Sequence, residues 1–322
     1  MIFSKMIDIV IASDSNYLPH AETLLVSIAR NNMTYNVINI HLIGNGITNK
    51  DFCKLNDLLL QFPNFHLFYY QIDDKEILAK LGGNIVGDRS LATFARIFIP
   101  DLLNCEKALY LDVDAIVNDD LSQLYEIDLT NYAIAGVRDT NPFIRRKNVG
   151  LEFEDIYINA GMILWNLDYC RKINFVDQCC DFIRQHDGHV DAMDQGTING
   201  VLGKQGLIKV ISPKFNAFSS FFQLNRKQIQ KLYKIPNFYD DGEISEARIN
   251  PTFIHFTPNM ITRPWVENCL HPFAYKYIEY RNYTNYPLHS LCKDNRKIKQ
   301  HFLSWIYNFC PTIYILFFMK KD

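Results

Sequence analysis

Apolar runs of strand length alternate with helical patterns from Ile7 to Asp114. The runs IDIVIAS, VINIHLIG, FHLFYYQID and ALYLDVD are separated by helical patterns such as AETLLVSIARNN and DFCKLNDLLLQF. Strands that read as near-continuous apolar runs are typical of a parallel sheet that helices cover on both faces. The rhythm therefore predicts an α/β chain with a Rossmann-like, mostly parallel sheet flanked by helices.

Further strands are expected at YAIAGV and IYINAGMILWNL. A helical pattern runs from Asp168 to about His186, and another helix opens near DQGTING. Between Phe215 and Asn250 the periodicity is lost, and we interpret this region as a long irregular excursion over the binding face. The run TFIHF then returns to the core.

Composition limits the classes of protein that fit. The 322 residues are 48% hydrophobic, which is enough for a sizeable core in one large or two modest domains. Because 33 basic and 35 acidic residues nearly cancel, the chain as a whole offers no electrostatic case for a nucleic-acid partner.

The cysteines and the N-terminus predict a cytoplasmic protein. Eight cysteines are scattered without a CxxC pair, and Cys179 and Cys180 are adjacent, which favours a reduced setting over a disulfide framework. The N-terminal apolar run is interrupted by Asp8 and reads as a core strand rather than a signal peptide.

Two aspartates, Asp112 and Asp114, end the apolar strand in KALYLDVDAIVNDD. Buried unpaired carboxylates are costly, so their position needs a partner, and a divalent cation bridging to phosphate would be one. Ligands bind at the carboxyl ends of parallel strands. Aspartates are also common where strands turn, so the motif alone leaves a structural role open.

Six blocks in order carry a resemblance to a known family: DIVIASDSNY, SLATFARIFIP, YLDVDAIV, INAGMILWNL, DQGTING and IHF followed by RPW. From about Asp8 to Tyr280 the chain resembles the family 8 retaining glycosyltransferases of the GT-A fold. It is nearest to the bacterial enzymes that add α-linked galactose or glucose to lipopolysaccharide.

The resemblance implies a role for each block. It implies metal binding by Asp112, Asp114 and His255, with Mn²⁺ favoured by the imidazole ligand and Mg²⁺ as the alternative. It also implies a set of substrate-binding residues, for the nucleotide and then the donor sugar: Ala12, Asp14, Asn16, Tyr17, Arg96, Asp112, Val113, Asn159, Asp194 and Gln195. Core, cap and turn roles remain open for His255, Asp14, Asn159 and Asp194, and a surface role for Arg96.

The resemblance also bears on catalysis. Gln195 would stabilise the cationic sugar, and Asp194 is the reserve candidate for a covalent nucleophile. The stretch HFTPNMITRPW departs from the family pattern: it is longer, lacks the usual glycine, and has Arg263 where lysine is expected. Arg263 is expected to bind the donor diphosphate, since arginine keeps the charge.

The sequence therefore predicts a metal-dependent retaining hexosyltransferase that moves galactose or glucose from a UDP-sugar to a saccharide or glycolipid acceptor of a bacterial surface polysaccharide. Two alternatives are a haloacid-dehalogenase-like phosphatase, which also has a strand-terminal DxD, and a non-catalytic sugar-nucleotide or glycan-binding protein.

The chain changes character near its C-terminus. We expect a catalytic domain over 1–284 and a membrane-association segment over 285–322, where basic residues precede an aromatic-rich uncharged run from Phe302 to Phe318. The run is short for a bilayer span and suits a peripheral position on the inner face of the cell membrane. A last helix docked on the core is the alternative.

Overall fold

The structure is a computed structural model that describes residues 5–81, 91–258 and 260–318. Parts of three segments quoted above lie outside the described residues: Ser90 of the SLATFARIFIP block, Asn259 of HFTPNMITRPW, and the last four residues of the C-terminal segment.

The strands are β1 (Met6–Asp14), β2 (Val37–Asn45), β3 (Phe65–Gln71), β4 (Lys107–Leu111), β5 (Ala115–Val117), β6 (Ile134–Gly136), β7 (Met162–Asn166), β8 (Ile208–Val210), β9 (Ala217–Phe218) and β10 (Phe253–His255). The helices of the first half are α1 (Leu18–Asn31), α2 (Asn49–Leu59), α3 (Asp74–Lys80), η1 (Leu91–Phe98), α4 (Ile99–Leu102), α5 (Ser122–Tyr125) and α6 (Phe143–Asn148). Those of the second half are α7 (Leu167–Lys172), α8 (Phe175–Gln185), α9 (Met193–Leu202), η2 (Pro213–Asn216), α10 (Ser219–Gln223), α11 (Arg226–Tyr233), α12 (Asp241–Ile249), α13 (Ala274–Arg281), α14 (Ile298–Phe309) and α15 (Pro311–Phe318).

A seven-stranded sheet forms the centre of the molecule, in the order β3-β2-β1-β4-β7-β6-β8. The pairs β1–β2, β2–β3, β1–β4 and β6–β8 are parallel, whereas β7 is antiparallel to both β4 and β6. The mostly parallel sheet predicted from the sequence is confirmed. A second sheet has the order β5-β10-β9.

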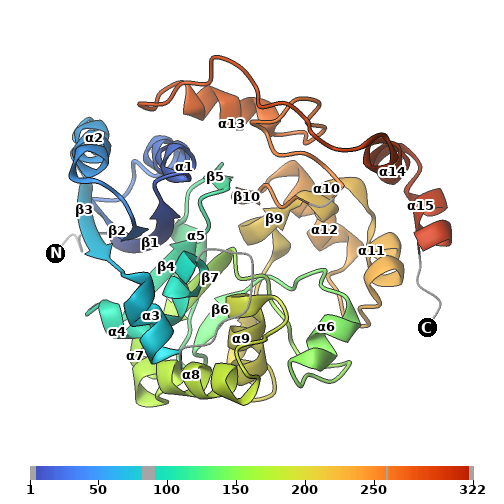
Figure 1. The fold of residues 1–322 in the computed structure, drawn as a ribbon, viewed down its shortest axis with the longest axis horizontal. Coiled ribbons are helices and arrows are strands. Elements are labelled where there is room, and N and C mark those ends of the chain that lie inside the picture. The colour runs from blue at the N-terminus through green and yellow to red at the C-terminus, as the bar shows by residue number, and fades with distance from the viewer. Residues whose placement is uncertain (1–4, 82–90, 259, 319–322) are drawn as a thin grey trace.

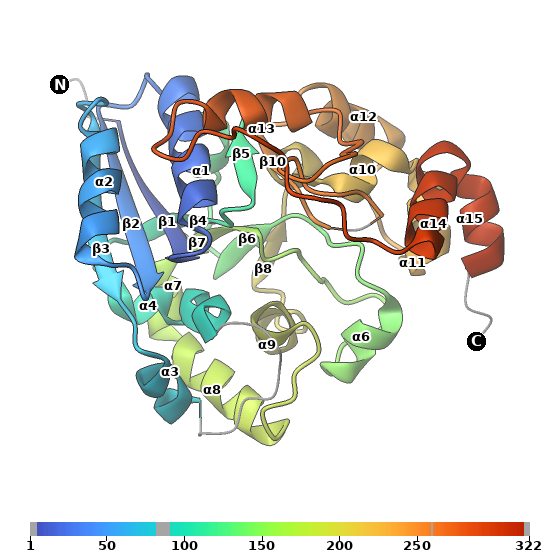
Figure 2. The same ribbon diagram turned by 45° about the horizontal axis from the view of Figure 1, so that its top comes forward.

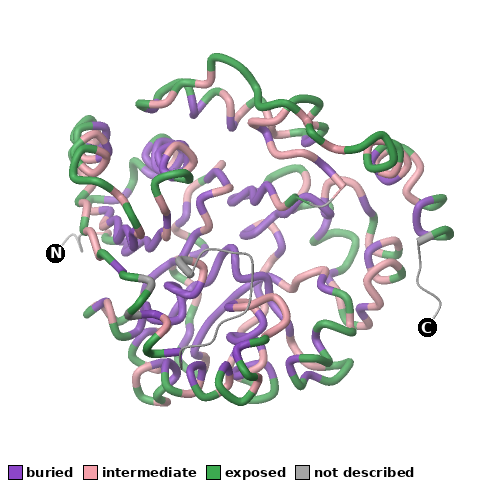
Figure 3. The backbone as a smooth tube through the Cα atoms, viewed as in Figure 1, coloured by how far each residue is buried: buried purple, intermediate pink, exposed green. Residues whose placement is uncertain are grey.

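Helices cover both faces of the large sheet. Figure 1 shows α1 and α2 on one side and α3, α7 and α8 on the other. Alternate side chains of β1 enter the two cores: Ile7, Ile9 and Ile11 pack with α1, and Val10 packs on the opposite face with η1 and α8. Figure 3 shows the buried positions concentrated in the strands. This double burial explains the continuous apolar runs of the sequence.

Two expectations from the sequence were wrong. The region from Phe215 to Asn250 is not irregular, because it folds into β9, α10, α11 and α12. The single helix expected from Asp168 to His186 is two helices, α7 and α8, separated at Asn174, whose φ of 53° is left-handed. A residue in that conformation cannot continue a right-handed helix.

The C-terminal segment runs back across the molecule. Helix α13 packs on α1, and α15 packs on α11 at the far edge, as Figure 2 shows. Tyr307 and Tyr314 are buried in the main core, while the outer side exposes an apolar surface at Trp305 (54% exposed), Leu316 (66%) and Phe317 (77%). Within the described residues, no helix has the length and apolarity to cross a bilayer. The helices thus dock on the core by one face, and the domain boundary near 284 stays a prediction.

Candidate active site

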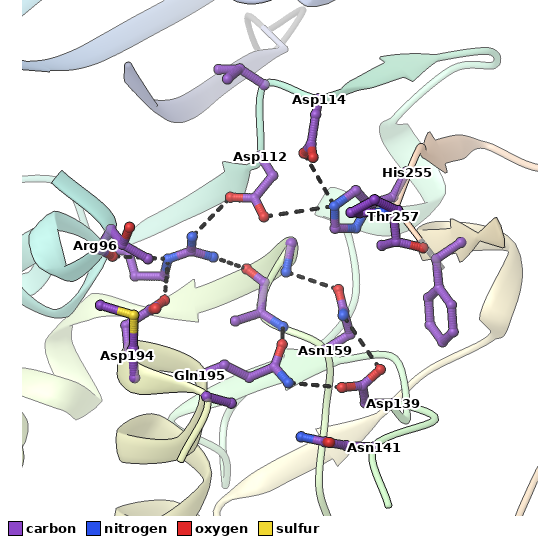
Figure 4. Close-up of a pocket in the computed structure, with 18 of the residues that line it drawn as sticks. Arg96, Asp112, Asp114, Asp139, Asn141, Asn159, Asp194, Gln195, His255 and Thr257 are labelled. Carbon is purple, nitrogen blue, oxygen red and sulfur yellow. Dashed lines mark hydrogen bonds and ion pairs between the residues drawn. The ribbon is translucent and has the colours of Figure 1, made fainter. Parts of the chain in front are cut away.

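A pocket of about 910 Å³ opens at the carboxyl ends of β1 and β4. Of the site residues predicted from the sequence, all but Asn16 line it, from Ala12 and Tyr17 at one end to Gln195 and Arg263. Asn16 is exposed on the turn before α1 and does not contribute to the pocket wall. Figure 4 shows the central side chains.

Strand pairing brings His255 to the two aspartates. After Asp114 the chain enters β5, which pairs antiparallel with β10 so that His255 lies opposite Ala115. The His255 Nε2 atom lies 3.2 Å from Asp114 Oδ1 and 3.8 Å from Asp112 Oδ2. Asp114 and His255 are 141 positions apart in sequence, and the pairing of β5 with β10 in the three-stranded sheet makes them neighbours.

Gly161 allows the histidine ring to approach this closely. A Cβ atom at position 161 would lie 2.1 Å from His255 Cε1 and 2.3 Å from Nδ1, which is shorter than any real contact. Any larger residue at 161 would displace the imidazole from the carboxylates.

The electrostatics of this cluster favour charged side chains. Burial alone would raise the pKa of Asp114, but His255 and Arg263 lower it well below its usual range. Burial would lower the pKa of His255, but Asp114 raises it above the ordinary value. The Arg263 Nη2 atom lies 2.7 Å from Asp114 Oδ2, and its guanidinium lies over the Trp265 ring. Asp114 therefore attracts cationic partners from two sides.

The donor set fits a divalent cation. One ligand atom from each of Asp112, Asp114 and His255 lies within 4.8 Å of the others. Two carboxylate oxygens and one imidazole nitrogen suit Mn²⁺ better than Ca²⁺. The buried His255 Nδ1 has no hydrogen-bond partner among the described residues, and Nε2 is the nitrogen that faces the carboxylates.

Arg96 links the two sides of the pocket floor. It lies in η1 and is buried, with Nη2 2.9 Å from Asp112 Oδ1 and Nε 2.7 Å from Asp194 Oδ2. Burial raises the pKa of Asp194 to about 6, although the charge of Arg96 opposes that rise. The surface position left open for Arg96 is thereby wrong, since a buried guanidinium holds two carboxylates.

A hydrogen-bond network fixes Gln195. Its Oε1 accepts from the Ala160 backbone N–H (2.9 Å), and its Nε2 donates to Asp139 Oδ2 (2.7 Å). Asn159 Oδ1 accepts from the Gly161 N–H (3.0 Å) and from Asn216 Nδ2 (2.9 Å). Gln195 and Asn159 are therefore held in one orientation beside the cluster, as Figure 4 shows.

The segment after β1 forms the other end of the pocket. Asp14 Oδ1 accepts from the backbone N–H groups of Asn16 and Tyr17, both at 2.9 Å. Asp14 thus fixes the turn before α1 but does not cap that helix, whose N-cap residue is Tyr17 and which has no side-chain cap. Asp14 also lines the pocket. The Tyr17 ring is 37% exposed and lies next to His20, so its face is accessible for stacking.

Sequence reasoning missed one wall of the pocket. Asp139, Thr140, Asn141 and Arg145 follow β6, which runs in the same direction as β1 and β4. The rule that drew attention to Asp112 applies equally to this strand end, where Arg138 and Asp139 follow YAIAGV. The wall is completed by residues of the misread region, Phe218, Ser220 and Tyr233.

Comparison with known proteins gives a consistent family. The family model described as glycosyl transferase family 8 matches residues 8–269. General stress protein A of Bacillus subtilis (strain 168) is 26% identical over 287 residues, which cover 88% of this chain and 95% of that protein. The lipopolysaccharide 1,2-glucosyltransferase of Escherichia coli (strain K12) is 23% identical, with 84% and 75% covered.

A solved structure has the same fold. It is the crystal structure of the galactosyltransferase LgtC in complex with donor and acceptor sugar analogs, with a TM-score of 0.70 and 20% identity. The alignment covers 87% of this chain and 96% of that chain. At this identity the likeness concerns the fold.

Proposed function

Because the chain belongs to glycosyltransferase family 8 and has the GT-A fold, we propose that it transfers galactose or glucose from a UDP-sugar to a saccharide acceptor with retention of configuration. The chain is a glycosyltransferase, so the phosphatase and the non-catalytic alternatives are set aside. The observation that carries the proposal is the cluster of Asp112, Asp114 and His255 in the pocket at the carboxyl ends of β1 and β4.

The metal-binding residues of this proposal are Asp112, Asp114 and His255, with Mn²⁺ as the ion. A divalent cation bound there supplies positive charge for the diphosphate leaving group. Arg263 supports the same task, because its guanidinium borders the pocket beside Asp114 and can bind phosphate oxygens in a fork.

The nucleotide and sugar sites use other residues that line the pocket. Tyr17 stacks on the uracil ring, Asp14 and Ala12 border the base and ribose, and Arg96 with Asn159 and Asp194 binds sugar hydroxyls. Gln195 stabilises positive charge at the anomeric carbon through Oε1, since its amide is held by Ala160 and Asp139. Asp194 is the reserve nucleophile for a covalent route. Val113 contributes from the strand end between the two aspartates.

The acceptor belongs to a bacterial surface saccharide in this proposal. The similarity to an enzyme named lipopolysaccharide 1,2-glucosyltransferase supports that pathway. The exposed apolar side of α14 and α15 supports a peripheral position on a membrane surface, where a lipid-linked saccharide would be met.

The test is UDP release from UDP-galactose and UDP-glucose, with added Mn²⁺, with Mg²⁺ and with a chelator. Asp114→Asn should lower turnover by more than about 100-fold and weaken Mn²⁺ binding by calorimetry, since even residues that only support a metal ligand cost 10- to 100-fold. Asp119→Asn, at an exposed aspartate five residues on, is the control and should behave as wild type. Full turnover of Asp114→Asn would refute the metal assignment.

A further inference from the structure

One wall of the pocket has no part in the proposed donor site. It is made by Thr140, Asn141 and Arg145, which follow β6, and by Phe218, Ser220 and Tyr233 across from them. Thr140 Oγ1 and Ser220 Oγ lie 3.4 Å apart, so the two segments meet. In a glycosyltransferase a pocket wall without donor contacts is available to the acceptor.

We propose that Arg145 recognises a negatively charged substituent, a phosphate or a carboxylate, on the acceptor saccharide. The inference rests on the proposed transfer reaction and deepens it by giving the acceptor a charge. Arg145 is exposed on α6 and lines the pocket. An exposed guanidinium offers a planar fork to an oxyanion without first losing its hydration to burial.

Of the three arginines that line the pocket, Arg145 differs from the other two in having no carboxylate partner among the described residues. Arg96 is paired with Asp112 and Asp194, and Arg263 with Asp114. In the part of the chain that the structure describes, the Arg145 guanidinium makes no ion pair or hydrogen bond.

The carboxylates of the pocket are also engaged. Asp139 accepts from Gln195, and Asp14 accepts from backbone N–H groups. Asp191 also lines the pocket, and it accepts from Nδ2 of Asn148, the last residue of α6, at 2.6 Å. No described carboxylate therefore lies within 4.0 Å of the charged nitrogens of Arg145.

The helices at this edge share one sign of charge. Helix α6 carries Arg145, Arg146 and Lys147, and α11, which ends at the lining residue Tyr233, carries Arg226, Lys227 and Lys231. Neither helix contains an acidic residue, in a chain whose net charge is −2. Like charges on both sides of an opening raise the local concentration of anions there.

Arg146, the second arginine of α6, forms no ion pair with a carboxylate among the described residues. Arg146 is buried and donates to the backbone carbonyls of Phe153 and Asp155 rather than to a carboxylate. Burial lowers its pKa, and the positive charge of Arg138 lowers it further. Arg146 is therefore a second cation close to this wall, and the acidic groups of Asp155 and Glu154 oppose the fall in its pKa.

The experiment is a calorimetric titration of the full chain, saturated with UDP and Mn²⁺, with glucose, glucose 6-phosphate, glucuronate and inorganic phosphate. Glucose 6-phosphate and glucuronate should bind at least about 10-fold more tightly than glucose, as charge-assisted hydrogen bonds predict. Arg145→Ala should remove most of that difference and Arg145→Lys should keep part of it. Lys147→Ala is the matched control, since Lys147 is exposed on the same helix but does not line the pocket.

Three outcomes would overturn the proposal. Equal binding of neutral and charged sugars would do so, as would a preference that survives in Arg145→Ala. If inorganic phosphate binds as tightly as the sugar phosphate, the site is for free anions and not for a saccharide.

Two further readouts keep the alternatives apart. Flotation of both variants with anionic vesicles identifies a membrane contact: a loss for Arg145→Ala there, without any change in sugar binding, would overturn the acceptor role. UDP release measured on the same preparations separates failure of the proposed transfer from failure of the Arg145 inference.

Discussion

Carboxylates at the floor of the pocket differ in the direction in which the pKa of each one shifts, because their partners differ. Asp114 faces two cationic groups, so its pKa falls, whereas burial raises the pKa of both Asp139 and Asp194. Arg96 is shared between Asp112 and Asp194, so it cannot fully compensate either one. Burying the negative charge of Asp194 on folding therefore costs free energy.

This cost predicts a pH dependence of stability. The pKa of Asp194 is about 6 in the folded chain against an ordinary 3.8, so the folded state holds its proton more tightly. Its stabilising contribution is complete below about pH 4 and is lost as pH rises through 6, by roughly 2 to 3 kcal/mol. Urea unfolding of wild type and Asp194→Asn from pH 4 to 7 checks this, since the variant should lose that part of the slope.

The control is Asp181→Asn, which removes an exposed carboxylate paired with Arg184 and should leave the slope unchanged. Parallel curves for wild type and Asp194→Asn would show that Asp194 ionises alike in both states.

At the residue scale, the strand-terminal DVD motif drew attention to Asp112 and Asp114, whereas His255 was expected only from the family resemblance. Asp112, Asp114 and His255 meet as expected, although their roles as ligands remain predictions. Asp139 was missed because β6 is only three residues long and its strand end looks like an ordinary turn. Its importance comes from contact with Gln195, 56 positions away, which no local pattern encodes.

At the element scale, the sheet was predictable because doubly buried strands have a strong pattern, while the helices of residues 219–249 were not. Two of these helices, α11 and α12, are short and start with capping boxes, at Asn225 with Gln228 and at Asp240 with Glu243. Such S/T/D/N-x-x-E/Q signals were present in the sequence and are more informative there than periodicity. The region from Phe215 to Asn250 also supplies Phe218, Ser220 and Tyr233, the half of the wall that lies across from Arg145.

The break between α7 and α8 gives a prediction at this scale. Asn174 has φ 53° and ψ 45°, a conformation that costs ordinary residues about 1 to 2 kcal/mol. Asn174→Ala should therefore lower the free energy of unfolding by about 1 kcal/mol, and Asn174→Gly should cost less, because glycine adopts this conformation freely. Chemical denaturation of both variants compares them, and a larger loss for glycine than for alanine would contradict the argument.

At the scale of the whole molecule, the C-terminal helices combine two properties that the sequence could not separate. The alternation of apolar and polar residues did not reveal which side faces the core. Tyr307 and Tyr314 are buried against the domain, yet Trp305, Leu316 and Phe317 remain exposed on the other side. A helix pair that only docked would have no need for an apolar outer surface. The two interpretations of the C-terminal segment, docking on the core and association with a membrane, are thus compatible, because each concerns a different face of the helices.

The outer face predicts binding to anionic membranes. Lys297 and Lys299 are exposed at the start of α14, and each basic residue near anionic lipid contributes about 1 kcal/mol, to which buried aromatic rings add. The double variant Trp305→Ser, Phe317→Ser should therefore partition less into anionic vesicles in a flotation assay, and salt should weaken attachment of the wild type. Tyr275→Ser is the control, because Tyr275 is 62% exposed on α13, apart from this face.

Since both substituted side chains point away from the core, UDP release by the double variant should match wild type. If all three proteins float alike, the outer face is not a membrane surface, and the helix pair serves to complete the core through Tyr307 and Tyr314.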